Sequence, residues 1–230
     1  MRVPSGVSGF DELIEGGFPS DRLYVVSGPP GSGKTTFCTQ FVTNGARAGE
    51  TCLYVTMHES KRELAEDMSS YDFGFDRALQ SEAVQFLNLV SETGKRTITK
   101  FGTDGGLTNR LVALIEQNGI DRAVIDSTML LQHFFSEKDD EITGFLSALK
   151  NSDATILLIS EMTDPTSYAD EHYLAHGVVF FHNFLDGSEM TRGVQVVKMR
   201  GTAIDCDIRE IDFADAGMRV FPERTVEIPA

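Results

Sequence analysis

The chain has 230 residues, 41% of them hydrophobic, and a formal net charge of −15 from 35 acidic and 20 basic residues. This length suits one α/β domain with a full core rather than two, so we expect residues 1–230 to form a single domain. The acidic balance argues against long-range attraction to nucleic-acid backbones, and it indicates either a solubilising surface or, as we favour, adaptation to a high-salt cytoplasm.

The hydropathy pattern and the cysteines give no sign of export. No apolar run reaches the ~20 residues needed to span a bilayer, and residues 1–6 lack the apolar stretch of a secretory signal. Cys38, Cys52 and Cys206 are scattered without C-x-x-C spacing, which predicts reduced thiols. We therefore expect a cytoplasmic protein with no membrane span.

The first predicted element is a short N-terminal helix. Ser8-Gly9-Phe10-Asp11 resembles a capping box, and Phe10, Leu13 and Ile14 share one apolar face. The glycines at residues 16–17 end this helix before the next apolar run.

That apolar run leads into a glycine-rich turn that fits the pattern G-x-x-x-x-G-K-[ST], with Gly28, Gly33, Lys34 and Thr35 in register. Glycines let backbone N–H groups converge on phosphate oxygens, and the following helix directs its positive end at the same anion. Lys34 would reach the β- and γ-phosphates, and the Thr35 hydroxyl would ligate Mg²⁺. The remaining nucleotide contacts are expected from the residues within and just after the turn: Pro30, Gly31, Ser32 and Thr36.

Strands and helices alternate after the loop, and the strands are near-continuous apolar runs of the kind found in buried parallel sheets. The expected helices cover residues 37–48, 61–69, 107–118 and 139–150. The expected strands cover residues 51–56, 84–90, 123–127 and 155–159. Residues 91–106, which contain four glycines, are predicted to form a long polar connection.

The pattern changes in the last third of the chain. Strands are predicted at residues 178–182, 193–199 and 208–212 with little helix between them. Asp186-Gly187 and residues 215–217 supply hairpin turns. The whole pattern predicts an α/β fold with a mostly parallel central sheet flanked by helices, extended at one edge by an antiparallel β-meander.

Two carboxylates follow the ends of predicted strands. Asp126 ends an apolar run about ninety residues after the loop, and we expect it to hold Mg²⁺ through water beside Thr35. Glu59 would orient or deprotonate the attacking water. The alternative for Glu59 is a place near the start of the next helix. His58 has no predicted role.

Lys198 and Arg200 flank Met199 at the end of a predicted strand, where alternation places both cations on one face. Two adjacent cations repel each other unless an anion lies between them. The γ-phosphate bound by a neighbouring subunit would be such an anion. A solvated strand edge protected by charge is the alternative, and the residues alone favour neither.

The whole chain resembles the KaiC family within the RecA-like ATPases. Four blocks carry the resemblance: Gly6–Leu13 with Gly16–Pro19, the phosphate loop, Val124–Ser127, and Lys198–Thr202. The resemblance implies a RecA-like fold with one KaiC-type domain that binds ATP and Mg²⁺ between subunits of a homo-oligomeric ring, commonly a hexamer. On that analogy Lys198 and Arg200 contact the next subunit's nucleotide, with Met199 and Thr202 contributing. Together with the acidic composition, it also implies an archaeal, halophilic source.

Two positions depart from the family pattern. Where the family usually shows two consecutive glutamates, this chain has His58-Glu59. If the essential base of the family is the first of the two glutamates, hydrolysis would be slow or absent here. If the second glutamate is enough, Glu59 would act as the base. Where the clock kinase domain carries a Ser-Thr phosphorylation pair, this chain has His172-Tyr173, which argues against the same autophosphorylation.

We therefore predict a Mg²⁺-dependent ATP-binding protein with weak ATPase activity, whose nucleotide state controls ring shape and the docking of an unidentified protein partner. One alternative is an ATP-gated scaffold with little or no hydrolysis, as in the related ATP-binding subunit of the archaeal motility motor. A DNA-strand-exchange protein is less favoured. Its DNA-contacting loops correspond to residues 128–141 and 162–176, and the second stretch contains three acidic residues and no Lys or Arg.

Overall fold

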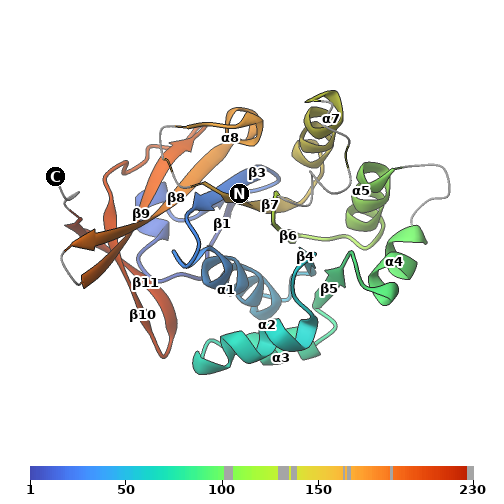
Figure 1. The fold of residues 1–230 in the computed structure, drawn as a ribbon, viewed down its shortest axis with the longest axis horizontal. Helices are drawn as coiled ribbons and strands as arrows, with labels where there is room; N and C mark the ends of the chain where they lie inside the picture. Colours follow the sequence, from blue (N-terminus) through green and yellow to red (C-terminus); the bar gives the residue numbers. More distant parts are fainter. Residues whose placement is uncertain are drawn as a thin grey trace.

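The centre of the molecule is a nine-stranded sheet (Figure 1). The computed structural model describes residues 1–100, 106–128, 135, 139–162, 164, 167–186 and 189–226, without the side chains of residues 139, 140 and 186. In order across the sheet, the strands are β11 (Gly217–Thr225), β10 (Arg209–Ala214), β9 (Glu189–Met199), β8 (Gly177–Asp186), β3 (Leu23–Gly28), β7 (Thr155–Glu161), β6 (Arg122–Asp126), β4 (Cys52–Thr56) and β5 (Val84–Asn88). Strands β1 (Arg2–Val3) and β2 (Phe18–Pro19) form a separate antiparallel pair.

The sheet has a parallel part and an antiparallel part, as predicted. Strands β8, β3, β7, β6, β4 and β5 are parallel to their neighbours in that order. Strands β8 to β11 then follow one another as an antiparallel meander at one edge. The meander contains one strand more than predicted, because the turn expected at residues 215–217 is followed by β11. The predicted turn residue Gly187 lies outside the described residues.

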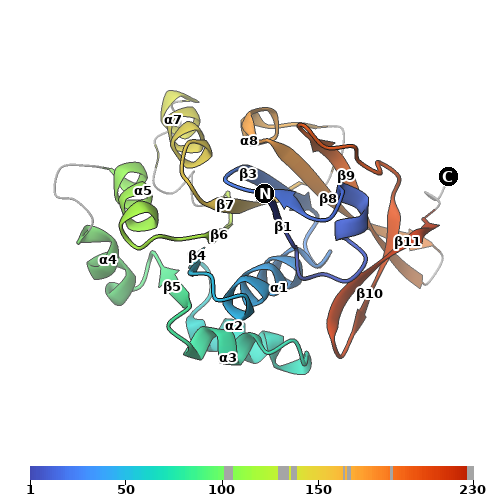
Figure 2. The ribbon, with the colours of Figure 1, turned by 180° about the vertical axis from the view of Figure 1, so that it is seen from behind.

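Helices cover both faces of the sheet (Figures 1 and 2). One apolar cluster joins the sheet to α1 (Lys34–Arg47), α2 (Lys61–Asp67) and α3 (Phe75–Gln80). A second joins it to α4 (Glu92–Thr99), α5 (Leu107–Gln117), α7 (Asp139–Lys150) and the residues after α8 (Asp170–Leu174). Alternation along β3 explains the division: Tyr24 and Val26 belong to the first cluster, and Leu23 and Val25 belong to the second. None of the described helices is long and apolar enough to cross a membrane.

Two local predictions are wrong. The predicted capping box does not form: the N-terminal helix is the 3₁₀ segment η1 (Asp11–Ile14), and Phe10 precedes it in helical geometry with no side-chain cap. The Asp11 carboxylate instead accepts a hydrogen bond from the Ser5 N–H at 2.9 Å. The predicted polar connection contains α4, whose first turn is capped by the Ser91 hydroxyl. Gly94 is needed there because a Cβ would lie 1.7 Å from the Asn88 carbonyl oxygen.

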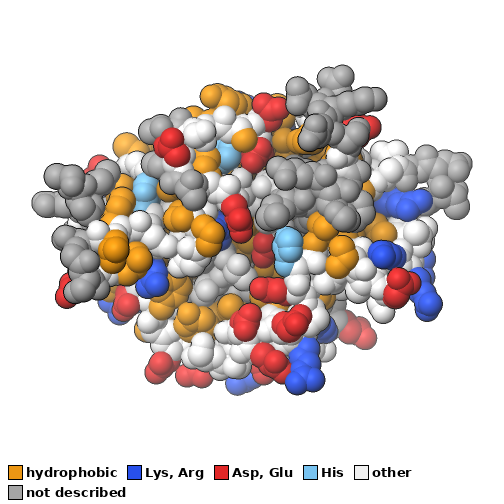
Figure 3. All heavy atoms as spheres, in the orientation of Figure 1, with side chains coloured by type: hydrophobic (Ala, Val, Ile, Leu, Met, Phe, Trp, Pro, Cys, Tyr) orange, Lys and Arg blue, Asp and Glu red, His pale blue; other side chains and the backbone are white. Residues whose placement is uncertain are grey.

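Surface charge is distributed unevenly over the helices. Figure 3 shows acidic side chains gathered over α2 and α3, with a smaller group of basic side chains near α4. Helix α2 contributes Glu63, Glu66 and Asp67 beside Lys61 and Arg62, whereas α4 contributes Lys95 and Arg96 beside Glu92. The two helices therefore carry net charges of opposite sign.

Candidate nucleotide-binding site

The predicted phosphate loop connects the buried strand β3 to α1, and its glycines have the conformations that the pattern requires. Gly28, Gly31 and Gly33 have φ values of +145°, +74° and +102°. A Cβ at Gly28 would lie 2.5 Å from the Phe181 carbonyl oxygen, and one at Gly33 would lie 2.5 Å from the Phe213 ring. A Cβ at Gly31 would meet nothing within 4 Å. The loop therefore packs tightly at both ends and is open at Gly31, where a phosphate can approach the backbone.

Lys34 lies within the curve of this loop and is only 7% exposed. Its Nζ donates to the carbonyl oxygens of Gly28 and Pro29, each at 2.9 Å. Burial lowers the pKa of Lys34, while the nearby charges of Glu161 and Asp126 raise it. The ammonium is thus held among acceptors at the position from which it can contact a bound phosphate.

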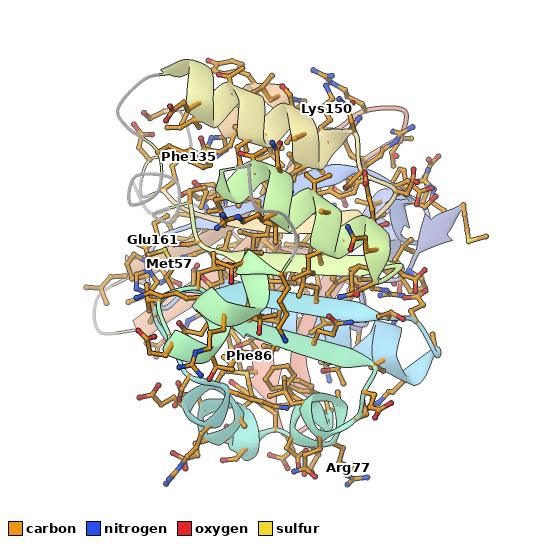
Figure 4. All side chains as sticks on the ribbon, turned by 90° about the vertical axis from the view of Figure 1, so that its right-hand side faces the viewer. Met57, Arg77, Phe86, Phe135, Lys150 and Glu161 are labelled. Atoms are coloured by element: carbon orange, nitrogen blue, oxygen red, sulfur yellow. The ribbon has the colours of Figure 1, made fainter. Side chains whose placement is uncertain are left out.

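The carboxyl ends of four parallel strands meet beside the loop. Register pairs Gly28 with Glu161, and Asp126 with Thr56 on β4. Figure 4 shows Glu161 and Met57, the residue after β4, at the same edge of the sheet. Sequence reasoning assigned no role to Glu161, although it ends a buried strand in the same way as Asp126.

Asp126 is positioned from beneath by Tyr54. The Tyr54 hydroxyl donates to Asp126 Oδ2 at 2.9 Å. Burial raises the pKa of Asp126, whereas the Tyr54 hydrogen bond and the charges of His58 and Lys34 lower it. A carboxylate held close to Lys34 and the first turn of α1 fits the predicted Mg²⁺ site with Thr35.

Glu59 is half-buried after β4, and burial followed by the charge of Asp126 raises the pKa of its carboxyl group. The capping bonds of α2 are made by other residues. Ser60 Oγ accepts from the Glu63 N–H at 3.2 Å, and Glu63 Oε2 accepts from the Ser60 N–H at 2.7 Å. Glu59 directly precedes the cap residue Ser60, so it lies near the start of α2 as the alternative also expects, and its catalytic role stays a prediction. His58 is exposed, and its charge lowers the pKa of both Asp126 and Glu59.

A cavity of about 420 Å³ opens over the loop and is lined by residues that the sequence did not reveal. Tyr71, Arg192 and Phe213 line this cavity together with Gly31 and the residues from Gly33 to Thr36. The Arg192 guanidinium carbon lies 5.4 Å from the centroid of the Phe213 ring. An aromatic and cationic wall facing a phosphate loop suits a nucleotide, with its flat base and negative charge.

Some buried polar atoms near the loop have no hydrogen-bond partner. Among the described residues these atoms are Ser32 Oγ in the loop, Asn183 Oδ1, Arg192 Nε at the cavity wall and, away from this site, Arg110 Nε. Asn183 and Arg192 are cross-strand partners on β8 and β9, and Asn183 Nδ2 donates to the Pro30 carbonyl at 3.3 Å. Buried polar groups are normally paired, so the three atoms near the loop fit a site built for a polar ligand such as Mg·ATP.

Lys198 and Arg200 share one face, as predicted, and contact α8. Lys198 Nζ donates to the carbonyl oxygens of His172 and Tyr173, each at 3.0 Å. Arg200 Nη2 donates to the Tyr173 carbonyl at 3.4 Å. Burial and the charge of Arg200 lower the pKa of Lys198. Within one chain, carbonyl oxygens therefore occupy the place between the two cations where we expected an anion.

This cation pair and the phosphate loop lie at opposite ends of the parallel strands; below, the edge of the sheet means the row of strand ends on one side. Met199 pairs with Gly177, which pairs in turn with Tyr24 near the start of β3, whereas the loop begins at Gly28 where β3 ends. About 13 Å of strand separates the two positions at the rise of a parallel strand. Lys198 and Arg200 therefore do not meet the loop of their own chain.

The other two residues predicted with this pair are also engaged within the chain. The Met199 side chain is buried in the core. Thr202 Oγ1 accepts from Arg2 Nη1 at 2.8 Å. Any contact of Met199 with a nucleotide would have to come from its backbone.

A family model described as "ATPase: KaiC" matches residues 3–225 of the chain. The chain belongs to the KaiC family. The circadian clock oscillator protein KaiC of Prochlorococcus marinus (strain MIT 9313) is 27% identical over 230 residues, covering 96% of this chain and 46% of that protein. The clock protein KaiC3 of Synechocystis sp. (strain ATCC 27184 / PCC 6803 / Kazusa) is 27% identical over 212 residues, covering 87% and 41%. The chain thus spans a little under half the length of these curated relatives.

A solved structure extends the likeness to the whole fold. The KaiC-like protein of the hyperthermophilic archaeon Pyrococcus horikoshii OT3 superposes with a TM-score of 0.79 at 28% identity, covering 96% of this chain and 99% of that one. The predicted RecA-like α/β architecture with its C-terminal meander is therefore confirmed.

In this KaiC-family chain, the structure brings the loop residues, Asp126 and Glu59 to one edge of the sheet and places Lys198 and Arg200 at the other. His172 and Tyr173, compared above with the phosphorylation pair of the clock kinase domain, belong to α8. Most of residues 128–141, compared above with a DNA-contacting loop, lie outside the described residues, as do residues 163, 165 and 166 of the second such loop.

Proposed function

We propose that this chain is a Mg²⁺-dependent ATP-binding protein of KaiC type with weak ATPase activity. The supporting observation is the glycine loop itself: its backbone is open at Gly31, and Lys34 Nζ lies within the loop, bonded to the carbonyl oxygens of Gly28 and Pro29. Loop N–H groups and Lys34 bind the β- and γ-phosphates, and Thr35 and Asp126 hold the metal. A metal ion held by Thr35 and Asp126 would supply positive charge that offsets the charge of the phosphates.

The cavity wall would bind the base of the nucleotide. We infer that the base lies beside Tyr71 and Phe213 and that Arg192 contributes positive charge, because these three side chains line the cavity over the loop. These contacts do not read the edge of the base, so they favour purine nucleotides over inorganic triphosphate without selecting adenine strongly.

Hydrolysis requires a group that positions water and a cation that neutralises the developing charge. Glu59 is the candidate for the first role, because its raised pKa improves a carboxylate as a base near neutral pH. Lys198 and Arg200 are the candidates for the second, acting on a nucleotide bound by a second copy. A homo-oligomeric ring, commonly hexameric in this family, would bring the opposite edges of neighbouring copies together. Slow turnover follows if one glutamate does the work usually shared by two.

The physiological role that we propose is regulatory. Nucleotide state would change the shape of the ring and so the docking of a protein partner in a high-salt cytoplasm. The exposed His58, at the first glutamate position of the family, favours one second candidate: an ATP-gated scaffold in which binding assembles the ring and hydrolysis is incidental.

Calorimetry in Mg²⁺ and steady-state phosphate release test both functions. Lys34→Ala should abolish the heat of ATP association. Glu59→Gln should retain Mg·ATP binding while phosphate release falls at least tenfold. Equal, near-zero phosphate release from the parent and Glu59→Gln, with binding intact, would favour the scaffold. Light scattering with and without ATP tests the ring, and a monomer in both conditions would remove the trans role of Lys198 and Arg200.

A further inference from the structure

A buried hydrogen bond ties α8 to the strand that ends in the phosphate loop. Ser27, the residue before Gly28, is fully buried, and its Oγ lies 2.7 Å from His172 Nε2. The Ala169 N–H donates to His172 Nδ1 at 3.1 Å. A neutral imidazole in this setting carries its proton on Nε2 and donates it to the Ser27 hydroxyl.

The neighbouring strand makes a matching connection. Ser160 is the parallel register partner of Ser27 and precedes Glu161 at the end of β7. Its hydroxyl donates to Glu171 Oε1 at 2.8 Å, and both residues are buried. Two adjacent serines at the nucleotide edge of the sheet are therefore bonded to two consecutive residues of α8.

The same short helix also holds the cation pair. The His172 carbonyl oxygen accepts from Lys198 Nζ, and the Tyr173 carbonyl oxygen accepts from both Lys198 and Arg200. His172 thus contacts the loop strand through its ring and the catalytic candidate Lys198 through its backbone. Because the surrounding core is close-packed, we expect a displacement of the His172 ring to move the His172 carbonyl group as well.

We propose that α8 couples the phosphate loop of one copy to the placement of Lys198 and Arg200, with His172 as the positioning residue. This inference rests on the proposed function, in which that cation pair acts on the nucleotide of a second copy. Phosphate binding shifts the backbone at the end of β3. The Ser27–His172 and Ser160–Glu171 hydrogen bonds transmit this shift to α8. The carbonyl oxygens of α8 then change the orientation of the Lys198 and Arg200 side chains. A copy that holds nucleotide therefore presents its cations to its neighbour differently from a copy that does not.

Amide hydrogen exchange tests this coupling without depending on turnover. The full chain is compared with and without Mg²⁺ and adenosine 5′-(β,γ-imido)triphosphate, and the readout is the peptide covering residues 198–202. We expect the nucleotide to change exchange there at least twofold in the parent. In Ser27→Ala this change should be lost while the dissociation constant of the analogue stays within threefold. Ser160→Ala, which breaks the second connection, should reduce the change.

Ser152→Ala is the matched control, since it removes another buried serine hydroxyl, one that donates to the Leu149 carbonyl at the end of α7. The nucleotide-dependent change should persist in this variant. The coupling is overturned if the parent shows no change at residues 198–202, or if Ser27→Ala and Ser160→Ala both retain it. Failure of the proposed function looks different: phosphate release is absent, or it is unaffected by Lys198→Ala, whatever the exchange shows.

Discussion

Replacing Tyr54 by Phe removes one hydroxyl group from beneath the proposed metal carboxylate and leaves the aromatic packing in place. The Tyr54 ring stacks on Phe86 with centroids 6.0 Å apart, and its hydroxyl donates to Asp126 at 2.9 Å. A hydrogen bond to a charged group contributes about 1.5–3 kcal/mol to stability. We therefore expect the free energy of unfolding of Tyr54→Phe to fall by about this amount at neutral pH.

The same substitution should change the pH dependence of metal binding. Burial raises the pKa of Asp126 and the Tyr54 hydrogen bond opposes this, so loss of the bond raises that pKa further. Mg²⁺ is bound by the deprotonated carboxylate, so affinity for Mg·ATP falls as pH drops through the pKa of Asp126. In Tyr54→Phe this fall should begin at a higher pH. The loss of stability should be largest where Asp126 is charged and should shrink as the pH is lowered and the carboxyl group is protonated.

Calorimetric titration of Mg·ATP over a pH series measures this effect, and Tyr24→Phe is the matched control. Tyr24 is equally buried on β3, but its hydroxyl donates to the neutral Pro19 carbonyl at 2.6 Å. Its loss should cost about 0.5–1.5 kcal/mol of stability and leave the pH profile of binding unchanged. A Tyr54→Phe profile that coincides with those of the parent and Tyr24→Phe would refute the role given to Asp126.

Three further experiments test other parts of the structure. Lys34→Ala and Lys198→Ala should each be inactive alone. Rings mixed from the two variants should regain phosphate release, because one variant supplies Lys34 and the other supplies Lys198 at a shared active site. An inactive mixture would contradict action in trans. Arg192→Met should weaken Mg·ATP binding at least tenfold in calorimetry, since a charge-assisted contact is worth about 1.5–3 kcal/mol, and unchanged affinity would place the phosphates elsewhere. Gly94→Ala should lower the midpoint of thermal unfolding, because its Cβ would overlap the Asn88 carbonyl group. Gly144→Ala is the control: open space surrounds this position, so the substitution should raise stability by about 0.5–1 kcal/mol. Equal midpoints for the two variants would contradict the tight packing of α4.

The phosphate loop and Asp126 could be predicted because their signals are local. Gly28, Gly33 and Lys34 lie in one short stretch, and an acidic residue at the end of an apolar strand needs only the parallel arrangement to reach the same edge. Glu161 also ends an apolar strand, but only Asp126 has the spacing of about ninety residues from the loop, and the position of Glu161 beside Gly28 emerged only from the strand register.

The remaining wall of the cavity could not be predicted in this way. Arg192 and Asn183 meet there because the β8–β9 hairpin pairs them across two strands, and the sequence does not specify that register. Helix α4 was missed for a different reason. Gly94 is a typical loop residue by composition, but here it allows the first turn of a helix to approach the Asn88 carbonyl, a contact between segments that is known only after folding.

The placement of the loop and the cation pair at opposite edges of one sheet limits how copies can cooperate. Under the proposed function, each copy holds the binding half of one active site and the cationic half of another. A two-fold dimer pairs residue i of one copy with residue j of the other and j with i, so it completes both active sites only if the loop and the cations lie in one self-complementary patch. A head-to-tail arrangement uses both edges of every copy, and it leaves no unfilled edge only when it closes into a ring. Assembly and turnover are then linked by the topology of the sheet itself, because the strand that begins beside the cations, β3, is the strand that ends in the loop.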